Sequence, residues 1–184
     1  MARHVAYQGA PGAFGEEACR TFLPEWLPVA RPSFEAVVES VLAGEVDRGM
    51  LPLRNSSAGP VPGVEELIAG SNLLVIERHS LPVRLHLLAV PGARLDGIRR
   101  VASHPMALAQ CRKWLDEAGL AVEEEANTAV AAQALAQAGD LEKAVMASEA
   151  AAKDYGLAIL KHDLQDAADN ATIFAIVARD PEGL

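Results

Sequence analysis

The sequence predicts an α/β protein in which helices cover an open sheet. Strand and helix signals alternate along all 184 residues, as βα units do. The composition is 51% apolar with only 4% aromatic residues, and Ala, Val and Leu supply much of the apolar share. A chain of this length can form one large domain or two small lobes, each with a buried core.

In the first half, strand and helix patterns are separated by turns rich in glycine and serine. Ser33 is a candidate N-cap for a helix with an apolar stripe from Ala36 to Leu42, and Gly44 follows it. The predicted elements are strands 4–8 and 49–53, helices 13–22, 36–42 and 64–68, a turn-rich loop at 55–60, and two extended segments within 72–90 around Ser80-Leu81-Pro82.

The second half repeats this order. Gly156 is expected to end the last helix. The predicted elements are strands 98–102, 120–124, 143–147, 157–160 and 172–177, and helices 105–118, 128–138 and 148–155.

Charge and hydropathy exclude several classes of partner. The net charge of -9 argues against a nucleic-acid partner and against a polybasic contact with a membrane. The longest apolar runs, such as residues 85–91, are too short to span a bilayer. The N-terminal residues pass into a strand pattern and lack the core of a signal peptide, so the expected location is cytoplasmic.

Neither a metal nor a cofactor is predicted. Cys19 and Cys111 lie far apart in helical patterns without CxxC spacing, which indicates buried thiols rather than a disulfide or a zinc site. The five histidines show no ligand spacing. No loop carries a GxGxxG or GxxxxGK[ST] pattern, so nucleotide binding is not indicated.

Polar clusters follow several predicted strands and precede helices. In an open α/β sheet, function concentrates in such loops, and the helix N-termini there favour small anionic ligands. Thr172 begins a buried strand after the polar Asp169-Asn170 turn. It is either a β-branched strand residue or a hydroxyl held at the edge of a cleft.

Taken together, six colinear segments resemble prephenate dehydratase, the enzyme that converts prephenate to phenylpyruvate. The family's GPxGTFSE, PxENSxxGxV, SHPQxxxQC and NxTRF motifs have counterparts in this chain, as do its TAxAA helix and a stretch at 147–157. The matching residues are GAPGAFGE at 9–16, PLRNSSAGPV at 52–61, SHPMALAQC at 103–111, TAVAA at 128–132, ASEAAAKDYGL at 147–157 and NATIF at 170–174.

The resemblance implies two α/β lobes arranged as in a type II periplasmic binding protein, with the active site in the cleft between them. Lobe one would comprise residues 1–80 plus 170–184, and lobe two residues 81–169. Family members commonly carry a C-terminal ACT domain that binds phenylalanine, whereas this sequence stops at Leu184, so that feedback control is expected to be missing. The family also implies a homodimer.

The family's roles carry over to matching positions. Thr172 matches the hydroxyl that assists the leaving group, and Asn55 and Gln110 match the functional amides, so these three are the predicted catalytic residues. The predicted substrate-binding residues, taken from the same motifs, are Ala13, Phe14, Arg54, Ser56, Ser103, His104, Ser148 and Phe174.

Each of these residues also has a structural interpretation. Asn55 fits an Asx-turn, and Ser103 and Ser148 fit helix caps. Gln110 and Arg54 are equally compatible with solvent-facing positions. His104 can satisfy a loop, and Phe174 can belong to the core.

Five positions depart from the family pattern. Arg54 stands where the family has Glu, and Ile173 where it has the Arg of TRF, which suggests that Arg54 replaces the missing guanidinium. Ala13, Gly15 and Met106 replace Thr, Ser and the first Gln of the motifs. These departures leave three alternatives to prephenate dehydration: arogenate dehydration, non-aromatising decarboxylation of prephenate, and a non-catalytic module that binds a small anion. The retained Thr172 favours dehydration.

Overall fold

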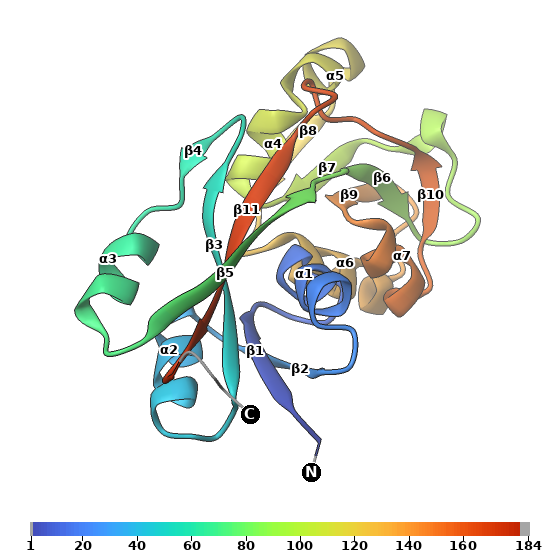
Figure 1. Cartoon of the computed structure of the whole chain (residues 1–184). Coiled ribbons are helices and arrows are strands. Elements are labelled where there is room, and N and C mark those ends of the chain that lie inside the picture. Colours follow the sequence, from blue (N-terminus) through green and yellow to red (C-terminus); the bar gives the residue numbers. More distant parts are fainter. Residues whose placement is uncertain (1, 181–184) are drawn as a thin grey trace. The chain divides into compact units, whose positions relative to one another are not determined.

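The computed structural model describes residues 2–180, which form two compact units, each with its own sheet (Figure 1). Within this range, unit 1 contains residues 2–10, 14–82 and 171–180, and unit 2 contains residues 11–13 and 83–170. The prediction of an α/β protein is confirmed, since helices pack against both sheets.

The sheet of unit 1 has the strand order β2-β1-β3-β11-β5, and β4 pairs with β3. β1 is parallel to β2 and β3, whereas β11 is antiparallel to both of its neighbours. Figure 1 shows β11, in red, between the cyan β3 and the green β5. The strands are β1 (His4–Gln8), β2 (Leu27–Arg31), β3 (Arg48–Asn55), β4 (Gly59–Pro60), β5 (Leu74–Pro82) and β11 (Ala171–Ala178).

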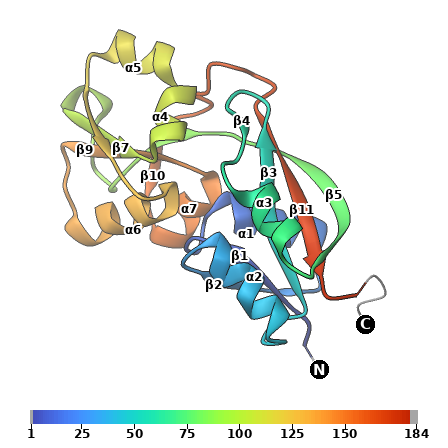
Figure 2. The same cartoon turned by 90° about the vertical axis from the view of Figure 1, so that its left-hand side faces the viewer.

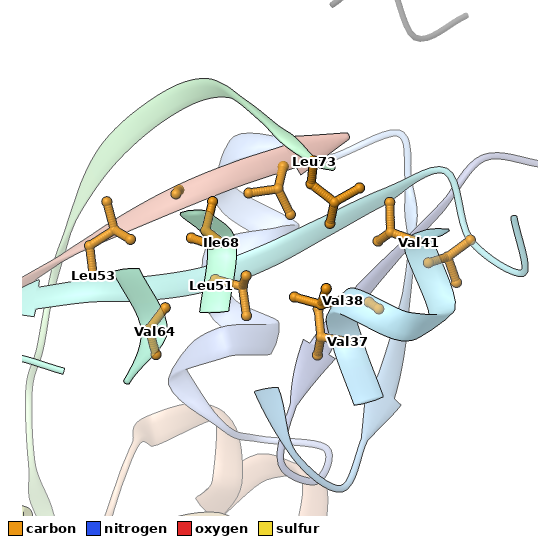
Figure 3. Packing of buried hydrophobic residues seen from close by; sticks show 12 residues of the cluster. Val37, Val38, Val41, Leu51, Leu53, Val64, Ile68 and Leu73 are labelled. Atoms are coloured by element: carbon orange, nitrogen blue, oxygen red, sulfur yellow. The ribbon is translucent and has the colours of Figure 1, made fainter. Parts of the chain in front are cut away.

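The helices of unit 1 are α1 (Phe14–Phe22), α2 (Phe34–Leu42) and α3 (Val64–Gly70). Ser33 caps α2 as predicted, since its Oγ accepts the N–H of Ala36 over 3.2 Å. The apolar side chains of α2 and α3 meet those of β3 in one buried cluster (Figure 3). This cluster holds the part of β3 that leads to Asn55.

The sheet of unit 2 has the order β10-β6-β9-β7-β8, in which β7 is parallel to β8 and β9, and β6 is antiparallel to β9 and β10. The strands are β6 (His86–Ala89), β7 (Arg100–Ser103), β8 (Ala121–Glu124), β9 (Lys143–Ala147) and β10 (Ala158–Lys161). The helices are η1 (Leu95–Gly97), α4 (Pro105–Gln110), α5 (Arg112–Ala118), α6 (Thr128–Ala138) and α7 (Glu149–Tyr155). α6 packs against β9 and α7 (Figure 2).

One prediction of secondary structure was wrong, and one strand was not predicted. The continuous helix expected over 105–118 is broken at Cys111, whose φ of -114° and ψ of 25° are not helical. The strand β2 was not predicted, because Pro28 and the exposed residues beside it conceal the strand pattern at this sheet edge. In addition, residues 59–60 of the expected loop pair with β3 as the short strand β4.

No helix in residues 2–180 is both long enough and apolar enough to cross a membrane.

Candidate active site

Asn55 and Thr172 meet at one end of the ladder between β3 and β11 in unit 1. They are register partners in this antiparallel pair, and Nδ2 of Asn55 donates a hydrogen bond of 3.0 Å to Oγ1 of Thr172. Both are buried, with exposures of 4% and 9%. The ladder therefore brings together two of the three predicted catalytic residues, which are 117 positions apart in the sequence.

The neighbours of Asn55 fix the orientation of its carboxamide. Oδ1 accepts the backbone N–H groups of Ser57 (2.8 Å) and Ala58 (2.9 Å), which can only donate. Nδ2 donates over 3.1 Å to the carbonyl oxygen of Ala171, which can only accept, and to Thr172. Oγ1 of Thr172 is therefore the acceptor in its contact with Asn55. Because no acceptor in the described part of the chain takes the Thr172 proton, the hydroxyl can donate it to a ligand.

Ser56 fastens the backbone immediately before Thr172. Its N–H donates to the carbonyl oxygen of Ala171 over 2.8 Å, and its Oγ accepts the N–H of Ala171 over 3.0 Å. The Ala171 carbonyl thus accepts hydrogen bonds from both Asn55 and Ser56. Asn55 combines the predicted Asx-turn with a side-chain bond to Thr172, and Ser56 acts as a backbone clamp.

Side chains alternate between the two faces of a strand, which separates the residues around Thr172. Phe174 lies on the same face as Thr172 and is buried, with 3% exposure. Ile173 is 38% exposed and stands opposite Arg54, which is also exposed. Arg54 and Ile173 therefore project from the sheet face opposite to that of Asn55 and Thr172.

In unit 2, the side chain of Gln110 is bound by Asn170. Nδ2 of Asn170 donates to Oε1 of Gln110 over 3.0 Å, and Asn170 is only 3% exposed. The backbone of Gln110 is held as well, since the N–H of Asp166 donates to its carbonyl oxygen over 2.7 Å. Gln110 is thus engaged rather than solvent-facing. The sequence did not single out Asn170 as a partner of Gln110, because residues 60 positions apart leave no local signal.

Ser103 and His104 have structural partners at the start of α4. Oγ of the fully buried Ser103 donates to the carbonyl oxygen of Met146 over 2.7 Å and so ties β7 to β9. His104 is the N-cap of α4, and its Nδ1 accepts the N–H of Met106 over 3.1 Å. In this geometry Nδ1 carries no proton, so the ring presents its other nitrogen as a donor.

Ser148 and Tyr155 of α7 hold the segment Pro11–Ala13, which belongs to unit 2. Ser148 caps α7 as predicted, and its Oγ also donates to the carbonyl oxygen of Gly12 over 2.7 Å. The Tyr155 hydroxyl donates to the carbonyl oxygen of Pro11 over 2.6 Å. The hydroxyls of one short helix therefore fix two consecutive peptides.

Ala13 and Phe14 follow where the chain enters α1. Ala13 is buried with 8% exposure, and Phe14 is half-buried as the first residue of α1. Ala13 has no polar side chain, so only its methyl group and its backbone are able to contact a ligand.

The three predicted catalytic side chains form hydrogen bonds without carrying charge. Cys111, next to Gln110, is not a nucleophile, because burial and the nearby Asp166 carboxylate raise the pKa of its thiol to about 12. Burial likewise raises the pKa of Cys19 to about 12. Both thiols are free and buried, as predicted. Within residues 2–180 no group of three His, Cys, Asp or Glu side chains is placed to hold a metal ion.

Comparison with known proteins gives a consistent family. The family model described as prephenate dehydratase matches residues 5–182. The chain is 41% identical over 177 residues to arogenate dehydratase/prephenate dehydratase 2 of Arabidopsis thaliana, covering 96% of this chain and 46% of that protein. It is 37% identical over 182 residues to the bifunctional N-acyl-homoserine lactone acylase/prephenate dehydratase of Komagataeibacter europaeus, covering 99% of this chain and 65% of that protein. The chain therefore spans only part of each relative.

Solved structures agree with the predicted architecture. The prephenate dehydratase of Arthrobacter aurescens, solved in complex with L-Phe, superposes with a TM-score of 0.89 at 30% identity, covering 96% of this chain and 60% of that one. A putative methionine-binding lipoprotein of Bacillus subtilis gives a TM-score of 0.51 at 14% identity, covering 99% of this chain and 85% of that one, which shows the fold alone. The likeness to binding proteins confirms the predicted fold class.

Proposed function

The chain belongs to the prephenate dehydratase family, and we propose that it converts prephenate to phenylpyruvate by decarboxylating dehydration. The observation that carries this proposal is the bond from Asn55 to Thr172, which leaves the Thr172 hydroxyl as a hydrogen-bond donor. The reaction needs such a donor at the oxygen that leaves the substrate.

The substrate supplies most of the driving force. As the bond from the ring to the carboxylate breaks, its electron pair enters the ring, and the bond to the C4 hydroxyl breaks on the opposite side. With one added proton, the products are phenylpyruvate, carbon dioxide and water, and the ring becomes aromatic. A donor that stabilises the leaving oxygen lowers the barrier, and positioned proton donation typically contributes about 10²–10⁴-fold.

Thr172 takes this role in our proposal, and Asn55 orients it. Gln110 would bind the substrate as a neutral donor. Arg54 would replace the cation missing at Ile173. Because its side chain leaves the sheet on the face opposite to that of Asn55 and Thr172, it would attract a substrate carboxylate through its charge rather than by direct contact. The remaining proposed substrate contacts, which come from the family motifs, are Ala13, Phe14, Ser56, Ser103, His104, Ser148 and Phe174.

The test is to incubate the purified protein with prephenate near neutral pH and to identify the product by ultraviolet absorbance and mass. Phenylpyruvate formed by the natural protein and lost in Thr172→Val supports the proposal. A decarboxylated, non-aromatic product that keeps its hydroxyl would replace it with decarboxylation alone. Saturable binding of prephenate without any product would indicate an anion-binding module.

Arogenate is the second candidate substrate, and the observation that favours it is the 41% identity to a plant protein named for both activities. Arogenate carries an ammonium group where prephenate carries a keto group, and its product is phenylalanine. Measuring kcat/KM for both substrates on one protein preparation decides between them. A preference for arogenate would leave the role of Thr172 unchanged and would make arogenate, rather than prephenate, the substrate of this step.

Cytoplasmic location and a homodimer remain predictions. The dimer is supported by the family resemblance, and light scattering on the purified protein tests it.

A further inference from the structure

Two buried asparagines make the same kind of contact with a predicted catalytic residue. Asn55 donates from Nδ2 to Oγ1 of Thr172 over 3.0 Å in unit 1. Asn170 donates from Nδ2 to Oε1 of Gln110 over 3.0 Å in unit 2. In each case the asparagine occupies an oxygen of its neighbour, which turns that neighbour's hydrogen atoms toward other partners.

Asn170 is itself fixed through its backbone. Its N–H donates to the carbonyl oxygen of Ala167 over 3.1 Å, and its carbonyl oxygen accepts the N–H of Val83 over 2.8 Å. With 3% exposure, its side chain is shielded from competing water. Burial and these backbone hydrogen bonds therefore fix the carboxamide of Asn170 beside Gln110.

The helix break at Cys111 places Gln110 where Asp166 and Asn170 can both bind it. Gln110 ends α4, and its carbonyl oxygen accepts the N–H of Asp166 in place of a helical partner. The Asp166 carboxylate in turn accepts the N–H of Lys113 near the start of α5, at 3.2 and 3.3 Å. One segment thus holds Gln110 twice, through Asp166 on the backbone and through Asn170 on the side chain.

We propose that Asn170 is a positioning residue, which holds Oε1 of Gln110 and thereby commits the Gln110 NH₂ group to donate to an oxygen of the substrate. This role rests on the proposed dehydratase function, because it gives Gln110 a substrate to bind. Asn170 acts through Gln110 and needs no contact with the substrate itself.

Asn170→Asp is the direct test, because a carboxylate has the same shape but cannot donate. It repels Oε1 of Gln110 and attracts the NH₂ group, which reverses the side chain. We expect kcat/KM to fall roughly tenfold to a hundredfold, the range for a hydrogen bond lost to a charged substrate group. Asn127→Asp is the matched control. Asn127 caps α6 by accepting the N–H of Val130 over 2.7 Å, which a carboxylate also does, so activity should stay unchanged.

A double mutant separates this role from simple structural damage. In the Gln110→Ala background, Asn170→Asp should cost no further activity, because the residue through which it acts is gone. A second loss of similar size in that background would overturn the proposal and assign the effect to the strand that begins at Ala171. Gln110→Glu should keep the bond from Asn170 and the folding stability, yet lose activity like Asn170→Asp.

A measurement that does not depend on turnover tests the positioning role of Asn170 separately from the proposed function. The side-chain NH₂ resonances of Gln110 are identified in an ¹⁵N spectrum by their absence in Gln110→Glu. They should shift in Asn170→Asp and stay in place in Asn127→Asp. Unmoved resonances would refute the positioning role even in an active enzyme. If the natural protein converts neither prephenate nor arogenate, the proposed function fails, and the shift still decides whether Asn170 orients Gln110.

Discussion

Arg54 stands directly opposite Ile173 across the ladder between β3 and β11. The resemblance places Glu and Arg at these two positions, so the cation has moved from one strand to its register partner. Both residues are exposed, and the side chain of Arg54 forms no ion pair or hydrogen bond with the part of the chain that the structure describes. The exchange therefore leaves one guanidinium at this point of the sheet, free of the carboxylate that would have neutralised it.

Replacing Arg54 by Ala should raise the KM for prephenate and leave kcat within about threefold. An exposed cation that acts on a substrate carboxylate through solvent contributes about 0.2–1 kcal/mol, so the increase in KM should be about fivefold or less. Steady-state kinetics at low ionic strength measure the change in KM. Arg78→Ala removes an exposed cation elsewhere on the same sheet, from β5, and should be silent. Equal KM values for all three proteins would assign Arg54 to solvent.

Replacing Thr172 by Val should lower kcat by about 10²–10⁴-fold with little change in KM, because the variant keeps the shape and loses the proton donor. Thr172→Ser keeps the hydroxyl and should retain most of the activity. Product formation from prephenate measures both variants, with circular dichroism to confirm folding. Wild-type kcat in Thr172→Val would remove Thr172 from the mechanism.

Replacing Asn55 by Asp should lower both stability and kcat. The carboxylate still accepts the N–H groups of Ser57 and Ala58 but cannot donate to Ala171 or Thr172, so the Thr172 proton turns inward toward it. Leaving such groups unpaired costs about 1–3 kcal/mol of unfolding free energy.

The same substitution should have almost no additional effect on kcat in a Thr172→Val background, because Asn55 acts through that hydroxyl. Urea unfolding and single-turnover kinetics separate the two effects. Additive losses of kcat would give Asn55 a direct contact with the substrate instead.

Replacing Gly12 by Ala should destabilise unit 2 more than replacing Gly139 does. Both glycines have positive φ, +87° and +66°, and Ala in such a conformation costs about 1–2 kcal/mol. A Cβ on Gly12 would also lie 2.7 Å from Cα of Ala151, whereas one on Gly139 meets nothing within 4 Å. Thermal unfolding of the two variants gives the difference. Equal losses of stability would mean that the segment around residue 12 shifts to accommodate the Ala side chain at no additional cost in free energy.

Stability should fall on acidification because of His86. Burial, more than the nearby His162, lowers the pKa of His86 below its usual 6.5, against the opposing effect of Asp163. Nδ1 of His86 accepts the N–H of Asp163 over 3.0 Å, a bond that requires the neutral ring. Because the folded state binds this proton less readily than the unfolded chain, the stabilisation is complete above pH 6.5 and is lost as pH falls through the folded pKa.

Urea unfolding from about pH 7.5 to 5 measures this loss. In His86→Gln the carboxamide oxygen still accepts the Asp163 N–H, so the pH dependence should flatten. An unchanged pH dependence in His86→Gln would place the titrating group elsewhere.

Local signals predicted the elements that depend on nearby residues. The predicted helix 128–138 and strand 143–147 match α6 and β9 at both ends, since caps and glycines mark the helix and β-branched and apolar residues fill the strand. By contrast, the break at Cys111 depends on Asp166, which supplies partners to both halves of the interrupted helix. No window around Cys111 contains that information.

The candidate site shows the same contrast between local signals and contacts of long sequence separation. The family motifs identified Asn55, Gln110 and Thr172, but the sequence could not show which side chains form hydrogen bonds with one another. Asn55 pairs with Thr172 because two distant strands are in register, and Gln110 pairs with Asn170 because a segment from another part of the chain reaches α4. Ser103 resembled a helix cap in sequence, yet it donates across the sheet to Met146.

The position of β11 between β3 and β5 also constrains how the chain folds. As residues 4–82 leave the ribosome, β3 and β5 each expose an edge that no strand yet covers, and both remain open until the whole of unit 2 has been synthesised. Unpaired edges of this kind invite intermolecular pairing, and contacts of long sequence separation form slowly. The strand that carries Thr172 is therefore also the one that completes the sheet, so a nascent chain remains prone to aggregation until that strand docks.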